Sequence, residues 1–277
     1  MRARPYFARA SIILALTIFV LAATAPFVWL ILSSFLQQQA LISTPPDLSP
    51  ASFTLNNYKE VFGSAAQLGR GLFNSLIIST FTTALALLLG APAAYALARL
   101  GIHRADIFLL MILAAQMFPA IVIVIPLFIA AAKLGLLDTK LTLILVYLSF
   151  NLPIVIWVLR GFFTNLPRSL ERAARMDGAT IFQTFRLIIL PISLPALFAA
   201  ASFAFIEAWN EFFFALIMTR QNAQTVPLVI SAFAGQYQTI FGQMMAAAAI
   251  SVAPIMLLTI LLRTTILRGF ADGLLKG

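Results

Sequence analysis

Long apolar runs separated by short polar segments dominate the chain. A membrane-spanning helix needs about 20 mostly apolar residues. Six stretches meet this requirement, one between Arg9 and Phe35 and the others at 71–98, 107–132, 141–159, 187–218 and 244–262. The pattern predicts an all-α membrane protein with about six transmembrane helices.

The first run is open to a second interpretation. Ala23-Thr24-Ala25 resembles a signal-peptide cleavage site. The apolar run continues to Leu32, longer than the apolar region of a typical signal peptide, which favours a span. We therefore expect a first transmembrane helix over 1–36, an extracytoplasmic loop over 37–70 with a short surface helix near Asn57 to Phe62, a core transmembrane domain over 71–265, and a C-terminal tail over 266–277.

Proline interrupts most of the predicted spans. Each proline removes a backbone donor and disfavours a straight helix. The residues concerned are Pro92, Pro119, Pro126, Pro153, Pro195 and Pro254. Ordinary kinking explains most of them, and a cavity or hinge is the alternative for some.

Composition supports the membrane assignment and excludes several functions. Of the 277 residues, 62% are hydrophobic and 10% are charged, whereas soluble domains carry about 25% charged residues. The net charge of +9 does not indicate nucleic-acid binding, because the basic residues fall between the apolar runs. There is no cysteine and only one histidine, His103, so we expect no metal site.

The distribution of basic residues predicts the orientation. If both termini are cytoplasmic, most Arg and Lys residues lie on the inside, as membrane insertion favours. The predicted location is a lipid membrane. The segment 164–190 is then a cytoplasmic loop.

This cytoplasmic loop is the most informative part of the sequence. Pro167 suits the first turn of a helix, and Gly178 suits a left-handed residue that ends it. Thr180 and Gln183 have capping-box spacing, so a second helix is expected to begin there and enter the membrane near Pro191. Small residues at 173 and 174 suit close approach of another surface. The residues alone leave open whether this helix docks on a partner or rests on anionic headgroups.

The loop carries a family resemblance. The run from Arg172 to Gly178, followed by Ile188-Ile189-Leu190-Pro191, resembles the EAA loop of ABC importer permeases. That motif reads Glu-Ala-Ala, three residues, Gly, nine residues, Ile-x-Leu-Pro. The one departure is Arg172, which stands where the family has Glu. Glu171 is adjacent, but a helix turns about 100° per residue, so its carboxylate is expected to point elsewhere.

Further stretches resemble the maltose-type, MalG-like carbohydrate permeases. They lie at 53–58, 74–76, 93–99, 134–139 and 208–212, and in the tail that begins at Arg268. The resemblance implies a type I ABC importer permease fold, a location in the bacterial inner membrane, and a transport subunit that is not itself an enzyme. It implies three kinds of partner: a second, MalF-like permease, a dimer of cytoplasmic ABC ATPases, and an extracytoplasmic sugar-binding protein. ATP and Mg²⁺ would be bound by the ATPases, consistent with the absence of a phosphate-binding loop motif here.

The resemblance also assigns candidate residues for coupling to the ATPases. These are Glu171, Arg172, Ala173, Ala174, Asp177 and Gly178. In this interpretation the loop helix sits in a cleft of one ATPase and transmits its closure to the spans. The predicted substrate is a sugar or oligosaccharide of the maltose or trehalose kind, and a non-sugar solute is the alternative.

Polar residues within the spans are candidates for a substrate path. Glu207 and Glu211 are four residues apart and are expected to share a helix face. They either line a hydrated path or pair with Arg70 or Arg220 for structural reasons. The other path candidates are Trp209, Asn210, Gln116 and Asn151, and the last two more often bond a neighbouring helix.

Two other functional classes fit the sequence less well. A secondary transporter or channel predicts inverted repeats or buried coupling charges, and no clear repeat is visible. A membrane enzyme would need a nucleophile or an acid–base pair, whereas His103 lies in a loop with none beside it.

Overall fold

The fold is helical throughout the described residues. The computed structural model describes residues 4–63, 66–235 and 239–274. Within these ranges the only β pairings are two isolated bridges, Leu36 with Phe53 and Ala234 with Thr239. The predicted all-α class is therefore confirmed. Arg2 and the end of the predicted tail at 275–277 lie outside the described residues.

Four helices are each long and apolar enough to span a membrane without interruption. They are α1 (Arg4–Ser34), α4 (Ala66–Arg99), α7 (Lys140–Asn165) and α14 (Phe241–Leu274). Two bent helix pairs raise the number of candidate spans in the described residues to six. The predicted number of spans agrees with this count.

The third predicted span is broken near its middle. Helix α5 (Ala105–Ala114) continues into the 3-10 turn η2 (Ala115–Met117), and α6 (Ala120–Lys133) follows at an angle of 88°. Phe118, the residue before Pro119, is extended, because proline disfavours the α conformation at the residue that precedes it. The predicted span over 107–132 is therefore two helices, and Pro119 is one of the prolines that interrupt the spans.

The fifth predicted span is also divided. Helix α9 (Ile181–Thr184) continues through a π-helical turn, η3 (Phe185–Ile189), into α10 (Leu190–Ile192). Helix α11 (Leu194–Asn210) then leaves at an angle of 77°. The bend falls at Ser193, whose hydroxyl donates to the carbonyl of Ile189 at 2.7 Å. Helix α12 (Phe213–Met218) is separate, so the predicted span over 187–218 is bent at Ser193 and its last helix ends at Asn210, short of Met218.

The chain forms two compact units. The first comprises Met1–Gly69 and Ile230–Ala253 and contains α2 (Gln38–Ile42), η1 (Pro50–Ser52) and α3 (Asn56–Gly63). The buried side chain of Asn57 donates to the carbonyls of Ser34 at 3.0 Å and Leu36 at 2.8 Å. A Cβ on Gly242 would lie 2.6 Å from the Asn57 amide, so only glycine allows this approach. The short helix predicted near Asn57 is present as α3.

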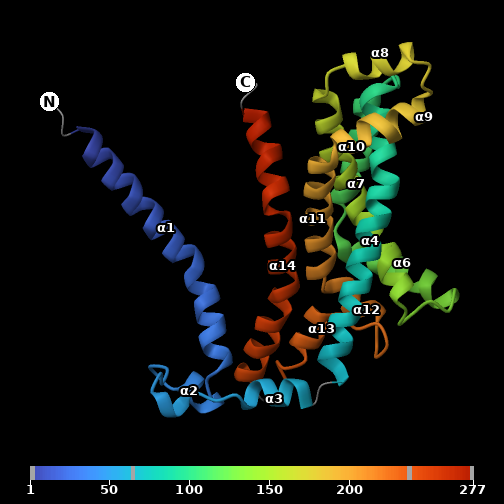
Figure 1. Ribbon diagram of the computed structural model, residues 1–277. Coiled ribbons are helices and arrows are strands. Elements are labelled where there is room, and N and C mark those ends of the chain that lie inside the picture. The colour runs from blue at the N-terminus through green and yellow to red at the C-terminus, as the bar shows by residue number, and fades with distance from the viewer. Residues whose placement is uncertain (1–3, 64–65, 236–238, 275–277) are drawn as a thin grey trace. The chain divides into compact units, whose positions relative to one another are not determined.

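The second unit comprises Arg70–Val229 and Pro254–Gly277 and holds the candidate site. Helices α4, α7 and α11 run side by side, and α8 (Ser169–Met176) crosses one end of them, while α12 lies toward the other end (Figure 1). A Cβ on Gly90 of α4 would lie 2.8 Å from Val155 Cγ1 of α7, so glycine permits close helix packing there. The short helix α13 (Val226–Ser231) follows the loop after α12.

Candidate functional site

A sharp turn joins α8 to α9 and is closed by backbone hydrogen bonds. Gly178 has φ +81°, a conformation that glycine adopts without steric cost. The Gly178 N–H donates to the Arg175 carbonyl at 3.1 Å, and the Ala179 N–H donates to the Ala174 carbonyl at 2.9 Å. This pair of bonds is a Schellman motif. The predicted left-handed role of Gly178 is confirmed.

The second helix begins where the capping-box spacing predicts. The Gln183 N–H donates to Thr180 Oγ1 at 3.2 Å, and the Thr180 N–H donates to Gln183 Oε1 at 2.8 Å. These bonds satisfy two donors at the start of α9 that the helix itself cannot satisfy. The direction of α9 relative to α8 is therefore fixed by residues within the loop.

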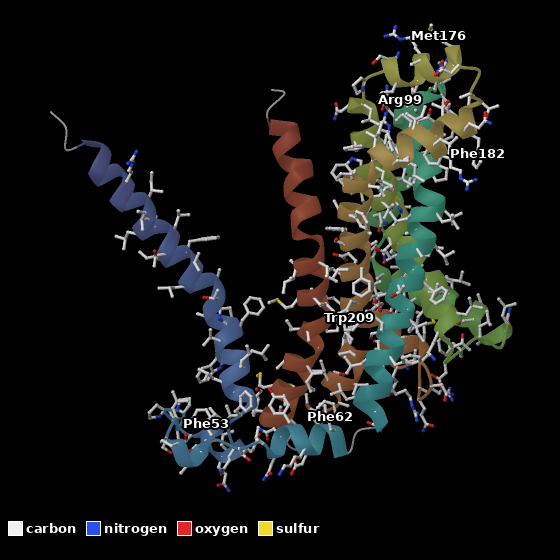
Figure 2. The ribbon with its side chains drawn as sticks, viewed as in Figure 1. Phe53, Phe62, Arg99, Met176, Phe182 and Trp209 are labelled. Carbon is white, nitrogen blue, oxygen red and sulfur yellow. The ribbon has the colours of Figure 1, made fainter. Side chains whose placement is uncertain are left out.

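Helix α8 has an inner and an outer face. Glu171 and Ala174 are buried, whereas Arg172, Ala173 and Met176 are exposed. Met176 is 88% exposed and points away from the neighbouring helices (Figure 2). Of the two small residues expected to allow close approach of another surface, Ala173 is exposed and Ala174 faces inward, because successive helical residues are about 100° apart.

The outer face is cationic with a few apolar side chains. The exposed basic residues are Arg168, Arg172, Arg175 and Arg186, and Asp177 and Gly178 are also exposed. Ile181 and Phe182 of α9 are 57% and 67% exposed. Arg175 and Ile181 also line a cavity next to Tyr95 and Glu171, whereas Arg172 and Met176 are exposed on α8 and accessible to a partner.

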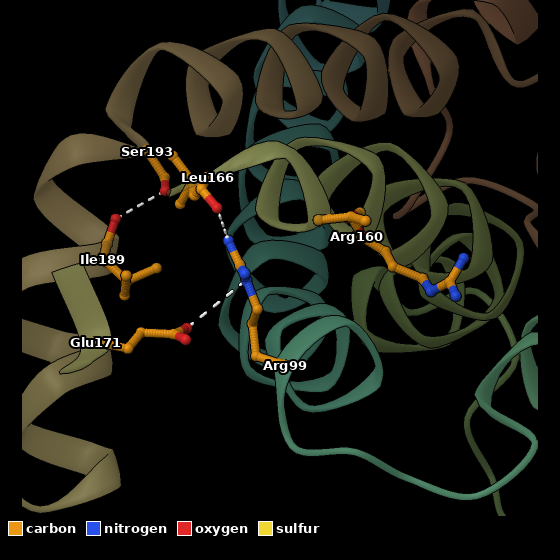
Figure 3. A network of polar contacts seen from close by, with 7 residues as sticks. Arg99, Arg160, Leu166, Glu171, Ile189 and Ser193 are labelled. Atoms are coloured by element: carbon orange, nitrogen blue, oxygen red, sulfur yellow. Dashed lines mark hydrogen bonds and ion pairs between the residues drawn. The ribbon is translucent and has the colours of Figure 1, made fainter. Parts of the chain in front are cut away.

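Beneath α8 lies a buried ion pair that the sequence analysis did not identify. Arg99, the last residue of α4, lies 3.6 Å from Glu171 (Nε to Oε1), and the two side chains are 4% and 6% exposed. The same guanidinium donates through Nη2 to the carbonyl of Leu166, the residue that ends α7 (Figure 3). One side chain thus joins the ends of three helices, α4, α7 and α8. The only sequence signal is an acidic residue in a basic loop.

Aromatic packing surrounds this ion pair. The ring of Tyr95 on α4 lies 5.9 Å from that of Phe163 on α7 and 5.0 Å from that of Phe185, centroid to centroid. A cavity of about 310 Å³ adjoins the pair and is lined by Tyr95, Arg99 and Glu171, among others. The inner face of α8 is therefore partly packed and partly open.

At the α12 end, Asp138 fixes a loop. Its carboxylate accepts backbone N–H groups of residues 220–223 at 2.9 to 3.2 Å and the Asn222 side-chain amide at 3.0 Å. Burial raises the pKa of Asp138, but the backbone hydrogen bonds from Arg220, Asn222 and their neighbours outweigh it, so the pKa lies below its ordinary value of 3.8. Sequence reasoning did not find this role.

Helix α4 holds the same loop from another side. The Asn74 amide donates to the carbonyls of Asn222 and Gln224, both at 2.9 Å. Ser75 Oγ accepts the Val226 N–H at 2.9 Å. Residues 222–226 are thereby fixed by side chains from two elements.

The path candidates on α11 occupy different environments. Trp209 is 2% exposed and its ring stacks on Phe205, with centroids 5.7 Å apart. Asn210 is exposed. Glu211 has left the helix, and its carboxylate accepts the N–H groups of Phe214 at 2.8 Å and Ala215 at 3.2 Å, so it caps α12.

The shared helix face expected for Glu207 and Glu211 is therefore wrong. Helix α11 ends at Asn210, and Glu207 is exposed. Neither carboxylate forms an ion pair with Arg70 or Arg220 in the described part of the chain.

Gln116 and Asn151 bond to backbone. Gln116 Nε2 donates to the carbonyl of Phe150 on α7 at 2.6 Å, which ties η2 to that helix. The buried Asn151 donates to the carbonyl of Tyr147 in its own helix at 3.0 Å. In the described ranges no group of three His, Cys, Asp or Glu residues is placed to hold a metal ion.

Comparison with known proteins gives consistent relatives. The family model "Binding-protein-dependent transport system inner membrane component" matches residues 86–271. The chain is 37% identical over 255 residues to the trehalose/maltose transport system permease protein MalG of Thermococcus litoralis, covering 91% of both chains. It is 39% identical over 233 residues to the trehalose transport system permease protein SugB of Mycobacterium tuberculosis, covering 83% of this chain and 85% of the relative.

A solved structure shares the fold. It is a chain from the crystal structure of a bacterial ABC transporter involved in the import of the acidic polysaccharide alginate, with a TM-score of 0.73 and 23% sequence identity. The match covers 95% of this chain and 98% of that one. The fold of an importer permease therefore extends over almost the whole chain.

Proposed function

The chain belongs to the family of binding-protein-dependent transport system inner membrane components, and we propose that it is the permease subunit of an ATP-driven sugar importer. It is a multi-pass transport subunit of the inner membrane and not an enzyme. The observation that carries the proposal is the α8–α9 segment, whose Schellman turn and capping box present an exposed face at one end of the spans. Its relatives are permeases, which agrees with this role.

The proposed substrate is a sugar or oligosaccharide, with trehalose and maltose as the first candidates. The two relatives compared above are named for trehalose and maltose, and a third, from Agrobacterium fabrum, is named for sulfoquinovosyl glycerol. These names point to carbohydrate and related polyol substrates, and none of the three points to a non-sugar solute.

The proposed mechanism is a division of labour among subunits. A binding protein delivers the sugar, this chain and a second, MalF-like permease form the path, and a dimer of cytoplasmic ATPases binds ATP and Mg²⁺. The exposed face of α8, with Arg172, Ala173, Asp177 and Gly178, docks on an ATPase. Closure of the ATPases on ATP then displaces α8 and switches the spans between inward-facing and outward-facing states. Both termini are cytoplasmic in this arrangement.

The break between α11 and α12 is the proposed contribution of this subunit to the path. Irregular backbone at membrane depth requires a protein or water environment that satisfies its polar groups. Glu211 satisfies the start of α12, and the exposed Asn210 lies directly beside the break. Asn210 is therefore a better candidate for a sugar contact than Trp209, Gln116 or Asn151, whose side chains are buried or bonded to backbone.

Reconstituted transport tests the proposal. The chain is co-produced with the second permease and the ATPases, placed in proteoliposomes, and supplied with the binding protein and radiolabelled trehalose or maltose. We expect uptake that needs both ATP and the binding protein. Uptake that continues without ATP, or a purified chain that never associates with an ATPase, would overturn the proposal.

A further inference from the structure

Helix α8 is joined to α7 and α9 by the chain itself, but its connection to α4 is made only through side chains. The ion pair between Arg99 and Glu171 provides this connection, and the bond from Arg99 to the carbonyl of Leu166 ties the same side chain to the end of α7. Helix α4 is one of the four uninterrupted spans. A link between α8 and α4 therefore reaches a full membrane crossing.

The burial of both charges makes this link difficult to break. A buried ion pair that loses one partner leaves an uncompensated charge, which is strongly unfavourable. The 3.6 Å separation between Arg99 Nε and Glu171 Oε1 exceeds a normal hydrogen bond, and neither atom has a hydrogen-bond partner in the described chain. Glu171 is the carboxylate that pairs with Arg99 in the described chain, and a cavity adjoins the two groups.

Guanidinium geometry suits this position. Arginine presents five donors in a planar fork, so one side chain can face a carboxylate and a carbonyl in different directions. Arg99 does so, with Nε toward Glu171 and Nη2 toward Leu166. Lysine, with one ammonium group, cannot occupy both places.

We propose that Arg99 is a positioning residue that joins α8 to the end of α4, so that the two helices move together when α8 is displaced. The proposal rests on the coupling role of α8 described above and adds the route by which its motion reaches a membrane span. Glu171 then acts inside the permease, while the exposed face of α8 contacts the ATPase.

A second ion pair provides a matched control. Arg160 on α7 pairs with Asp106 on α5, but the Asp106 side chain is 81% exposed, and Arg160 points away from Glu171 (Figure 3). Arg160→Gln removes the same charge from a neighbouring helix without touching α8. Exposed pairs contribute little to structure, so this variant is expected to behave as wild type.

The experiment measures both coupling and distance in the assembled transporter. The chain has no cysteine, so spin labels at Leu100→Cys and Ser169→Cys are unique in it and report the separation of the α4 end from α8. The distance between the two labels is measured without nucleotide and with ATP, in wild type, Arg99→Gln and Arg160→Gln. The second readout is trehalose imported per ATP hydrolysed.

We expect one unchanged distance in wild type and Arg160→Gln, and a distance that changes with ATP in Arg99→Gln. Import per ATP should fall roughly tenfold in Arg99→Gln, within the factors of about 5 to 150 typical of coupling between sites. Arg99→Lys should restore it only in part. If the Arg99→Gln transporter fails to assemble, Glu171→Gln takes its place in the test, because it keeps the Arg99 bond to Leu166. The same distance and import-per-ATP measurements are then made on that variant.

Two results would overturn the linkage. One is a wild-type distance that changes with ATP, and the other is an Arg99→Gln or Glu171→Gln variant that matches Arg160→Gln in both readouts. Import that does not depend on ATP would instead refute the proposed function, and it is seen in the wild type before any variant is tested.

Discussion

Substitutions at Gly178 separate the folding of the α8–α9 turn from its docking. A Cβ built on Gly178 meets nothing within 4 Å, and φ is +81°. Within this chain the only penalty is therefore conformational, about 1–2 kcal/mol for most residues in the left-handed region. That penalty reduces the population of the native turn by a factor of roughly 5 to 30. Asparagine tolerates this region better, and valine worse.

We therefore expect a graded series in ATP-driven uptake, with Gly178→Asn close to wild type, Gly178→Ala lower and Gly178→Val lowest. Hydrogen exchange of the α8 amides should follow the same order, because a loosened turn exposes them. Gly161→Ala is the control, since a Cβ there also meets nothing and the residue lies within helix α7. Equal activity of all three Gly178 variants would refute the conformational argument. Loss of uptake in Gly178→Asn with normal exchange would show that a partner surface approaches too closely for any side chain.

Three further predictions concern other parts of the second unit. Because the pKa of Asp138 is below 3.8 when folded, its stabilising contribution is complete above pH 3.8 and is lost as the pH falls through the folded value; Asp138→Asn should lower the thermal midpoint in detergent at neutral pH and remove this acid-sensitive component. Gly90→Ala should destabilise by about 1–3 kcal/mol through overpacking, and Val155→Ala in the same chain should recover part of the loss in thermal unfolding, since the clash is with Val155 Cγ1. Glu211→Ala should cost about 0.5–2 kcal/mol as a lost helix cap and increase proteolysis at the α11–α12 break, whereas a role in ion pairing alone predicts no change there.

The elements that the sequence predicted correctly depend on neighbouring residues. The turn at Gly178 and the cap at Thr180 use bonds between residues at most five apart in the chain. The uninterrupted spans depend on composition over about 20 residues. Local chemistry and hydropathy suffice for both.

The features that the sequence did not predict depend on the direction in which helices run and on contacts between residues far apart in the chain. Hydropathy does not distinguish a straight span from one that bends by 88° at Phe118 and Pro119, because both halves are equally apolar. The pairing of Arg99 with Glu171 requires knowing which face of α8 turns inward. Glu211 was predicted to line the path because the helix was expected to continue beyond Asn210, where α11 ends.

The α8–α9 turn is preorganised. Its Schellman bonds and its capping box lie entirely within residues 174–183, so no other subunit is needed to form them. Association costs less when the contacting segment is already ordered. A small interface can then suffice to bind an ATPase subunit. Because the segment folds without outside contacts, it can be exchanged between related permeases to change which ATPase they bind.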